Sequence, residues 1–235
     1  MFNIKQTWDE TFLQLIGEEE TKTETNPVDW RASGRATKDY PDKENKQWWD
    51  DKGPEMVQTF INFWENNRWS IWHTPNGTPA VEIEMNVTFG NVPVKCYADL
   101  IAVTPAGELG VVDLKTGAST PESTMQLGVY ACAMEILFDI RPSIGFYYSA
   151  RSGIMEPVNI DQWTIPILSD LFNQFKKGLD NEIFLPNMGM TCKSCSVKEY
   201  CYSMGGQLSH NFDPLSHIKY GEKNGNINRR RSVPS

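Results

Sequence analysis

The chain has 235 residues, of which 40% are hydrophobic and 22% charged, and a formal net charge of −8. This composition is typical of a globular protein with one substantial domain, and it argues against a protein that coats nucleic acid by bulk positive charge. No apolar stretch approaches the roughly 20 residues that span a bilayer, and the acidic N-terminal segment lacks the pattern of a signal peptide. We therefore expect a cytoplasmic protein with no membrane partner.

The first 50 residues are polar and are predicted to form an irregular lead-in with one short helix near 8–16. A longer helix is predicted to open at 50–53, with Pro54 in its first turn, where a missing N–H leaves no helical hydrogen bond unmade. Its apolar residues recur at helical spacing: Met56, Val57, Phe60, Ile61 and Trp64.

The middle of the chain alternates between strand and helix patterns. Residues 80–89 alternate apolar and polar side chains, which is typical of a strand with one buried face, and further strands are predicted at 94–103 and 109–115. Apolar periodicity predicts helices at 121–138 and 163–178, with a strand at 143–150 between them. This order predicts an α/β fold with a mixed central sheet flanked by helices.

The composition also suggests how the chain is divided. We expect residues 1–50 to be a polar lead-in and residues 51–185 to form the folded core. Residues 186–206 contain three cysteines and are expected to form a C-terminal appendage. Residues 207–235 are rich in Asn, Gly and Arg, and we expect a flexible basic tail there.

Three charged residues interrupt the apolar strands. Asp113 and Lys115 are two residues apart at the end of one strand, so both side chains leave the same face. Asp99 lies in the preceding strand, and the short turn at 105–108 would bring it near Asp113. From the D-x-K spacing alone, a buried structural ion pair is the favoured interpretation, and the wider context reverses that preference.

Two neighbouring carboxylates repel unless a cation lies between them. Oxygen ligands with open coordination positions suit Mg²⁺ or Mn²⁺, and such a cation polarises a phosphate oxygen and acidifies a bound water. Lys115 beside it would orient that water or offset the charge that builds on the phosphate. The alternative to a structural ion pair is therefore a metal site at Asp99, Asp113 and Lys115 that would act on a phosphate group.

The order of the motifs resembles that of a known family. Asp99, the segment DLKTG at 113–117 and the segment QLGVY at 126–130 are similar to the active-site series of the PD-(D/E)XK nucleases. More narrowly, they resemble the RecB-type exonucleases, including CRISPR-associated and phage-encoded members. The resemblance covers about residues 53–201 and implies a restriction-endonuclease-like fold. It also implies that Gln126 and Tyr130, which share a helical face, contact DNA or order the catalytic lysine.

The same resemblance implies further metal ligands. The backbone carbonyl of Leu114 would complete the metal shell between the two aspartates. The first helix of the family often supplies another ligand, frequently His, and Gln58 stands at that position here, with Glu55 one turn away as the alternative. Glu82, in the first long strand, also resembles a position of the family, with surface charge as the alternative interpretation.

A cysteine cluster near the C-terminus is the second motif. Cys192, Cys195 and Cys201 form the series C-x2-C-x5-C, which favours metal binding over disulfides. Many RecB-type nucleases carry this series, together with a fourth cysteine near the N-terminus, around an iron–sulfur cluster. Residues 1–95 contain no cysteine, so three alternatives stay open. They are a [4Fe–4S] cluster, a zinc ion completed by His210 or His217, and a site without metal.

The resemblance implies a divalent-metal-dependent deoxyribonuclease, more specifically an exonuclease that acts on DNA ends or single strands. A structure-specific endonuclease would use the same residues. A catalytically silent DNA-binding subunit of recombination or repair is the alternative from another class. The implied partners are DNA and a recombination or replication protein, and a phage-encoded protein would act in the host cytoplasm.

Overall fold

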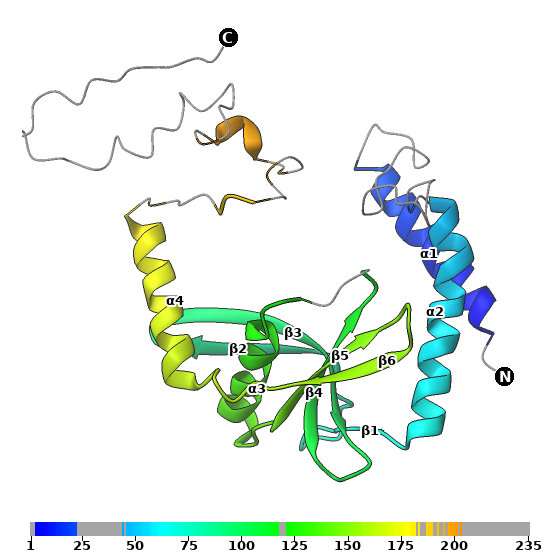
Figure 1. Ribbon diagram of the computed structural model, residues 1–235, viewed down its shortest axis with the longest axis horizontal. Helices are drawn as coiled ribbons and strands as arrows, with labels where there is room; N and C mark the ends of the chain where they lie inside the picture. The colour runs from blue at the N-terminus through cyan, green and yellow to red at the C-terminus, as the bar shows by residue number, and fades with distance from the viewer. Residues whose placement is uncertain are drawn as a thin grey trace, which may run out of the picture. The chain divides into compact units, whose positions relative to one another are not determined.

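The computed structural model (Figure 1) describes residues 3–22, 44, 46–117, 121–181, 183, 187–189, 192, 195, 197–201 and 203. Its α-helices are α1 (Ile4–Glu20), α2 (Lys46–Asn67), α3 (Met125–Phe138) and α4 (Ile165–Asp180). Its strands are β1 (Ser70–Ile71), β2 (Val81–Phe89), β3 (Val92–Val103), β4 (Leu109–Lys115), β5 (Ile144–Ser149) and β6 (Ile154–Val158). A short 3₁₀ helix, η3, spans Lys198–Tyr200.

The chain divides into two compact units. The first comprises Met1–Phe89 and Pro93–Leu168, and the second comprises Gly90–Val92 and Ser169–Ser235. The first unit contains the sheet apart from the β2–β3 turn, and it contains every residue of the predicted nuclease site. Within the second unit, the backbone N–H of Asn91 donates to the Asn173 side chain at 3.0 Å.

The sheet has the order β1-β3-β4-β5-β6, with β2 also paired to β3. The strands β3 and β4 run antiparallel, with Leu100 opposite Val112. The strands β4 and β5 run parallel, with Asp113 beside Tyr147, and α3 lies in the connection between them, as a parallel crossover requires. The sheet is therefore mixed, and the predicted α/β class is confirmed.

Helices cover both faces of the sheet. On one face, Phe60, Phe63 and Trp64 of α2 pack against a buried cluster that includes Val112 and Tyr148. The helix α3 lies on the other face. A Cβ added at Gly145 of β5 would be 2.9 Å from Leu127 of α3. Gly145 points away from the face of Tyr148, because successive residues of a strand point to opposite faces. Asp113 and Lys115 point to this second face, because side chains alternate along β4 and Val112 points to the first face.

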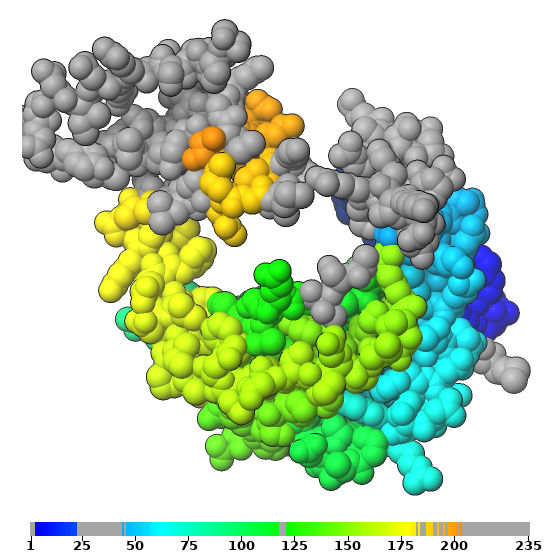
Figure 2. Space-filling view, in the orientation of Figure 1, coloured from blue at the N-terminus to red at the C-terminus, as the bar shows by residue number. Residues whose placement is uncertain are grey.

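The N-terminal helices are longer than the sequence predicted. α1 runs from Ile4 to Glu20 rather than over 8–16, and α2 begins at Lys46, so the prediction that Pro54 occupies a first turn is wrong. A Cβ added at Gly53 would lie 1.8 Å from the Trp8 ring, and the two helices lie side by side (Figures 1 and 2). We attribute the turns of α2 before Pro54 to this packing, which offsets the hydrogen bond that proline cannot donate.

The central strands and helices lie close to the predicted ranges, and β4 matches 109–115. The sequence missed β1, which has two residues, and β6. β6 contains Pro157 and follows Gly153, whose φ is 68°. These residues resemble a turn in the sequence, but a proline is tolerated in a strand at the sheet edge, which is where β6 lies.

No helix among the described residues is long and apolar enough to cross a membrane. The predicted tail at 207–235 lies outside the described residues, as do His210 and His217. The division of the chain at 51, 186 and 207 stays a prediction.

Candidate active site

Asp99 lies where β3 and β4 separate. The last paired residues of the two strands are Leu100 and Val112, and one step further along this register Asp99 would stand opposite Asp113. At this point a side-chain hydrogen bond replaces the backbone pairing: the Asp99 Oδ2 accepts a bond of 2.7 Å from the backbone N–H of Leu114. This bond fixes the carboxylate of one strand against the backbone of the next.

Asp113 is the most buried charged group of the site. Its exposed fraction is 1%, and its Oδ2 lies 2.5 Å from Lys115 Nζ. Burial raises the pKa of the Asp113 carboxyl, the Lys115 ammonium opposes this rise, and the charge of Asp99 adds to it. The charge of Asp99 therefore acts on the Asp113 carboxyl, as expected for residues at the ends of adjacent strands.

A chain of polar contacts links Lys115 to α3. Lys115 Nζ lies 3.4 Å from Gln126 Oε1, and Gln126 Nε2 donates to the Tyr130 hydroxyl at 2.8 Å. Burial raises the pKa of Tyr130, and the charges of Asp99 and Asp113 raise it further. The structure therefore brings together all five residues that the sequence predicted as catalytic.

A sixth residue, Tyr147, lies beside these five and was not predicted from the sequence. Tyr147 lies beside Asp113 in the parallel register of β4 and β5, and Lys115 Nζ is 5.7 Å from the centroid of its ring. Its hydroxyl donates to the carbonyl of Ser123 at 3.0 Å. Only the strand order places this ring against the lysine, and no short motif carries that information.

The donor set fits a hard divalent cation. The charge of Asp99 acts on the Asp113 carboxyl, and Asp113 Oδ2 is buried with no hydrogen bond of normal geometry, although it forms the ion pair with Lys115. Carboxylate oxygens of this kind suit Mg²⁺ or Mn²⁺. Within the described part of the chain, no three His, Cys, Asp or Glu side chains form a group that could hold a metal ion. The site therefore offers two carboxylates.

The predicted first-helix ligands are not brought to the aspartates. Gln58 donates to Asn62 at 2.8 Å, and Glu55 forms an ion pair with Lys52 at 2.8 Å. Both contacts lie within α2, whose aromatic residues pack on the sheet face opposite to Asp113. The roles of Gln58, Glu55 and the Leu114 carbonyl as ligands stay predictions.

Glu82 has an unusual backbone at the start of β2. Its φ is 48°, a conformation that residues with a Cβ adopt rarely, and its side chain is exposed. Two positions earlier, the carbonyl of Ala80 accepts a hydrogen bond of 2.9 Å from the backbone N–H of Ile101 of β3. The alternation of the sequence predicted the strand here but not this irregularity.

A cleft opens beside Asp99 on the α2 side of the sheet. Its volume is about 390 Å³. Glu65 and Asp99 are its only acidic lining residues, and the others are apolar: Phe60, Ile61, Trp64, Ile71, Val81, Leu100 and Leu114.

Three aromatic side chains of α2 and β3 contact charged groups. The Arg151 guanidinium lies 4.9 Å from the Trp48 ring centroid and 5.8 Å from that of Trp49. Tyr97 is 45% exposed and donates to Glu84 at 2.7 Å.

The cysteines are all free thiols. In the second unit, Cys192 Sγ accepts a bond from the Gly189 N–H at 3.2 Å, and the described residues place no three metal-binding side chains together. In the first unit, Cys96 and Cys132 are partly and fully buried, and burial raises the pKa of both thiols, that of Cys96 to about 11. They behave as core residues, and iron–sulfur or zinc binding at the C-terminal series stays a prediction.

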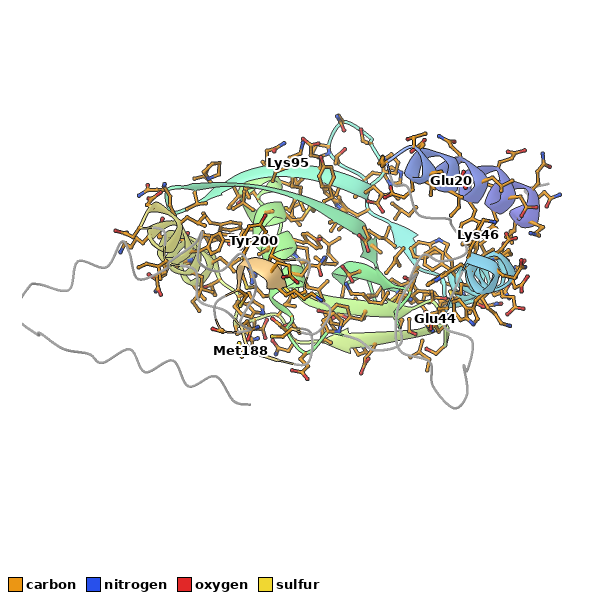
Figure 3. All side chains as sticks on the ribbon, turned by 90° about the horizontal axis from the view of Figure 1, so that it is seen from above. Glu20, Glu44, Lys46, Lys95, Met188 and Tyr200 are labelled. Carbon is orange, nitrogen blue, oxygen red and sulfur yellow. The ribbon has the colours of Figure 1, made fainter. Side chains whose placement is uncertain are left out.

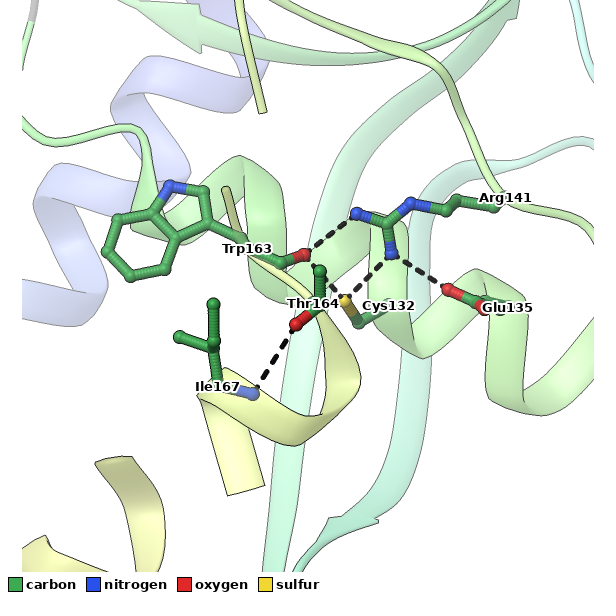
Figure 4. A network of polar contacts seen from close by, with 6 residues as sticks. All are labelled: Cys132, Glu135, Arg141, Trp163, Thr164 and Ile167. Atoms are coloured by element: carbon green, nitrogen blue, oxygen red, sulfur yellow. Dashed lines mark hydrogen bonds and ion pairs between the residues drawn. The ribbon is translucent and has the colours of Figure 1, made fainter. Parts of the chain in front are cut away.

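Cys132 has a structural neighbourhood (Figure 4). Its Sγ lies 3.1 Å from the Trp163 carbonyl oxygen, and Arg141 donates to Cys132, Glu135 and that same carbonyl at 2.7–3.0 Å. These contacts connect α3 to the segment that leads into α4. The α3 residues in these contacts, Cys132 and Glu135, come after Tyr130, and none of the contacts involves Gln126 or Tyr130.

Sequence comparison places this site in a family. Residues 8–202 match the sequence profile of the PD-(D/E)XK nuclease superfamily. The chain belongs to this superfamily. Its mixed sheet flanked by helices is the restriction-endonuclease-like fold of the superfamily, and the predicted fold is thereby confirmed.

Two phage proteins are similar to this PD-(D/E)XK chain. The Gene 69 protein of Mycobacterium phage D29 is 30% identical over 191 residues, which cover 72% of this chain and 69% of the phage protein. The Gene 69 protein of Mycobacterium phage L5 is 28% identical over 199 residues, covering 67% and 68%. The crystal structure of SSO0001 is 16% identical with a TM-score of 0.41 and covers 84% of this chain and 97% of that one.

Proposed function

We propose that this PD-(D/E)XK protein is a divalent-metal-dependent deoxyribonuclease of the RecB type, and that it degrades DNA from ends or as single strands. The observation that carries the proposal is the convergence of Asp99, Asp113 and Lys115. The two carboxylates lie on adjacent strands, and the ammonium lies 2.5 Å from one of them. A structural ion pair between Lys115 and Asp113 would not require the half-buried Asp99 as a second aspartate beside it, because like charges destabilise each other.

Each residue has a separate role in this proposal. Asp99 and Asp113 hold Mg²⁺ or Mn²⁺, which supplies an acidified water and neutralises charge on the phosphate. Asp99 is oriented by the Leu114 N–H. Asp113 is deprotonated for this role, although its burial favours the neutral acid. Lys115 donates to the phosphate oxygen or to the attacking water, at the place where negative charge develops.

Gln126 and Tyr130 keep Lys115 available for the reaction. An ammonium that bound Asp113 alone would be held away from the phosphate, and Gln126 Oε1 offers it a second acceptor at 3.4 Å. Tyr130 fixes the amide of Gln126 so that its oxygen faces the lysine. This arrangement supports the role that the family resemblance implies for the helix.

The proposal is tested with end-labelled linear DNA in the presence of Mg²⁺ or Mn²⁺. We expect the wild type to degrade it, and Asp113→Ala and Lys115→Ala to be slower by two or more orders of magnitude. Covalently closed single-stranded circles separate the two modes, because an exonuclease leaves them intact and an endonuclease opens them. Undiminished activity in both variants would exclude this site as the source of cleavage.

A further inference from the structure

The turn between β5 and β6 contains an arginine whose donors are all directed at fixed partners. Arg151 Nε donates to the carbonyl of Thr116 at 2.6 Å. Its two terminal nitrogens donate to the two oxygens of Glu44 at 2.6 and 2.8 Å, and its plane lies over the Trp48 ring. Glu44 is labelled in Figure 3, close to Lys46, where α2 begins.

These contacts require a guanidinium. The fork of two parallel donors matches a carboxylate, and the Nε–H remains for a third acceptor in the same plane. The side chains of Arg151 and Glu44 are only 18% and 12% exposed, so the pair is held in one orientation more firmly than a surface ion pair. A lysine at this position has one charged atom and cannot bind both Glu44 and Thr116 with the same geometry.

The carbonyl group that accepts the Arg151 bond belongs to Thr116, which directly follows Lys115, the last residue of β4. The pairing of β4 with β5 ends at Lys115 beside Ser149, and the last backbone bond runs from the Ala150 N–H to the Lys115 carbonyl at 2.9 Å. Beyond this bond, the backbone leaves the sheet through exposed Thr116. The hydrogen bond from Arg151 to Thr116 therefore holds the backbone one residue beyond Lys115, where the pairing of β4 with β5 has ended.

We propose that Arg151 is a positioning residue, which acts through Thr116 to keep Lys115 beside Asp113, and that Glu44 in turn orients Arg151. Among its contacts with described residues, the Arg151 side chain has none with Asp99, Asp113 or Lys115. This inference rests on the proposed function of Lys115, and it adds that Glu44 contributes to the nuclease site. A displacement of about one ångström at a reacting group is enough to slow catalysis.

The kinetic test compares Arg151→Lys, Arg151→Ala and Glu44→Gln with Arg141→Lys. Arg141 is a matched control, because it makes a similar set of hydrogen bonds in the same unit, around Cys132 (Figure 4). We expect both Arg151 variants to lower kcat by about 10- to 100-fold with little change in KM, as loss of an outer-shell partner does. Arg141→Lys should lower the melting temperature and leave kcat unchanged.

Chemical rescue separates positioning from general destabilisation. Guanidinium ion, added well below denaturing concentrations, should restore part of the kcat of Arg151→Ala and none of that of Arg151→Lys, whose side chain fills the space. Equal kcat losses in Arg151→Lys and Arg141→Lys, or wild-type kcat in Arg151→Ala, would overturn the proposal.

A second readout does not depend on cleavage. In protein whose lysines carry ¹³C-dimethyl groups, the Lys115 signal is assigned by its absence in Lys115→Arg, and Asp113 and the Tyr147 ring shift it from the position of exposed lysines. Arg151→Ala should move this signal towards the exposed position, and Arg141→Lys should not. If the wild type fails to cleave DNA, the proposed function fails, and the Lys115 signal still decides whether Arg151 positions the lysine. An unmoved signal in Arg151→Ala would refute that role.

Discussion

Replacing Gly128 with alanine tests how closely α3 must approach the rest of the site. A Cβ at this position would lie 2.2 Å from Trp163 Cβ and 2.3 Å from Trp163 Cγ. Trp163 Cβ is bonded to the backbone, so no rotation of the tryptophan side chain removes its overlap with the added Cβ. Overpacking of this kind costs up to about 3 kcal/mol, and the better helix propensity of alanine returns about 1 kcal/mol. The net loss of about 2 kcal/mol should lower the melting temperature by about 4–8 °C.

Gly17→Ala is the matched control for this prediction. Gly17 also lies within a helix, α1, and a Cβ there would meet nothing within 4 Å. The same chemical change should therefore raise the melting temperature by about 2–4 °C, through helix propensity alone. Differential scanning fluorimetry of the two variants gives the comparison. If Gly128→Ala is as stable as Gly17→Ala, the close contact between α3 and Trp163 does not exist.

Three further predictions concern the site and its support. Asp113→Asn should raise the melting temperature of the metal-free protein at neutral pH. Burial raises the pKa of Asp113 in the folded state, so the charged form opposes folding, and this penalty disappears as the pH falls below the ordinary pKa of an aspartate. Melting curves from pH 3 to pH 8 check this, and an advantage of Asn that persists in acid would argue against it. Gln126→Ala should lower kcat about tenfold or more. Tyr130→Phe should lower kcat less, because the phenylalanine keeps the ring and only releases the Gln126 amide. Steady-state kinetics measure both, and an unchanged kcat for Gln126→Ala would show that Lys115 needs no second acceptor. Arg141→Met should destabilise the protein by about 2 kcal/mol, through lost hydrogen bonds around Cys132, and denaturant unfolding at wild-type stability would contradict this.

The sequence predicted the central strands and the site for local reasons. Alternation along β2 and the apolar run of β4 are properties of a few consecutive residues, and the D-x-K spacing fixes which side chains share a face. The short turn between β3 and β4 then brings Asp99 to Asp113. Each step depends on neighbours in the chain, so the sequence contained the information.

The features that the sequence did not predict depend on distant contacts. Arg151 and Glu44 are 107 residues apart, and no local pattern identifies them as a pair. The first turns of α2 depend on Trp8, which packs at Gly53 from another helix. β6 is stabilised by its pairing with β5, against the weak strand propensity of its own proline. Such contacts are known only once the elements are packed.

Binding of Mn²⁺ to the protein without DNA tests the central claim most directly. Isothermal titration calorimetry, with electron paramagnetic resonance of the bound ion, should detect a site in the wild type that is lost in both Asp99→Ala and Asp113→Ala. Glu108→Ala, in the turn that joins the same two strands, should bind Mn²⁺ as the wild type does. Unchanged Mn²⁺ affinity in both aspartate variants would contradict the account, because the two carboxylates would then not share a cation.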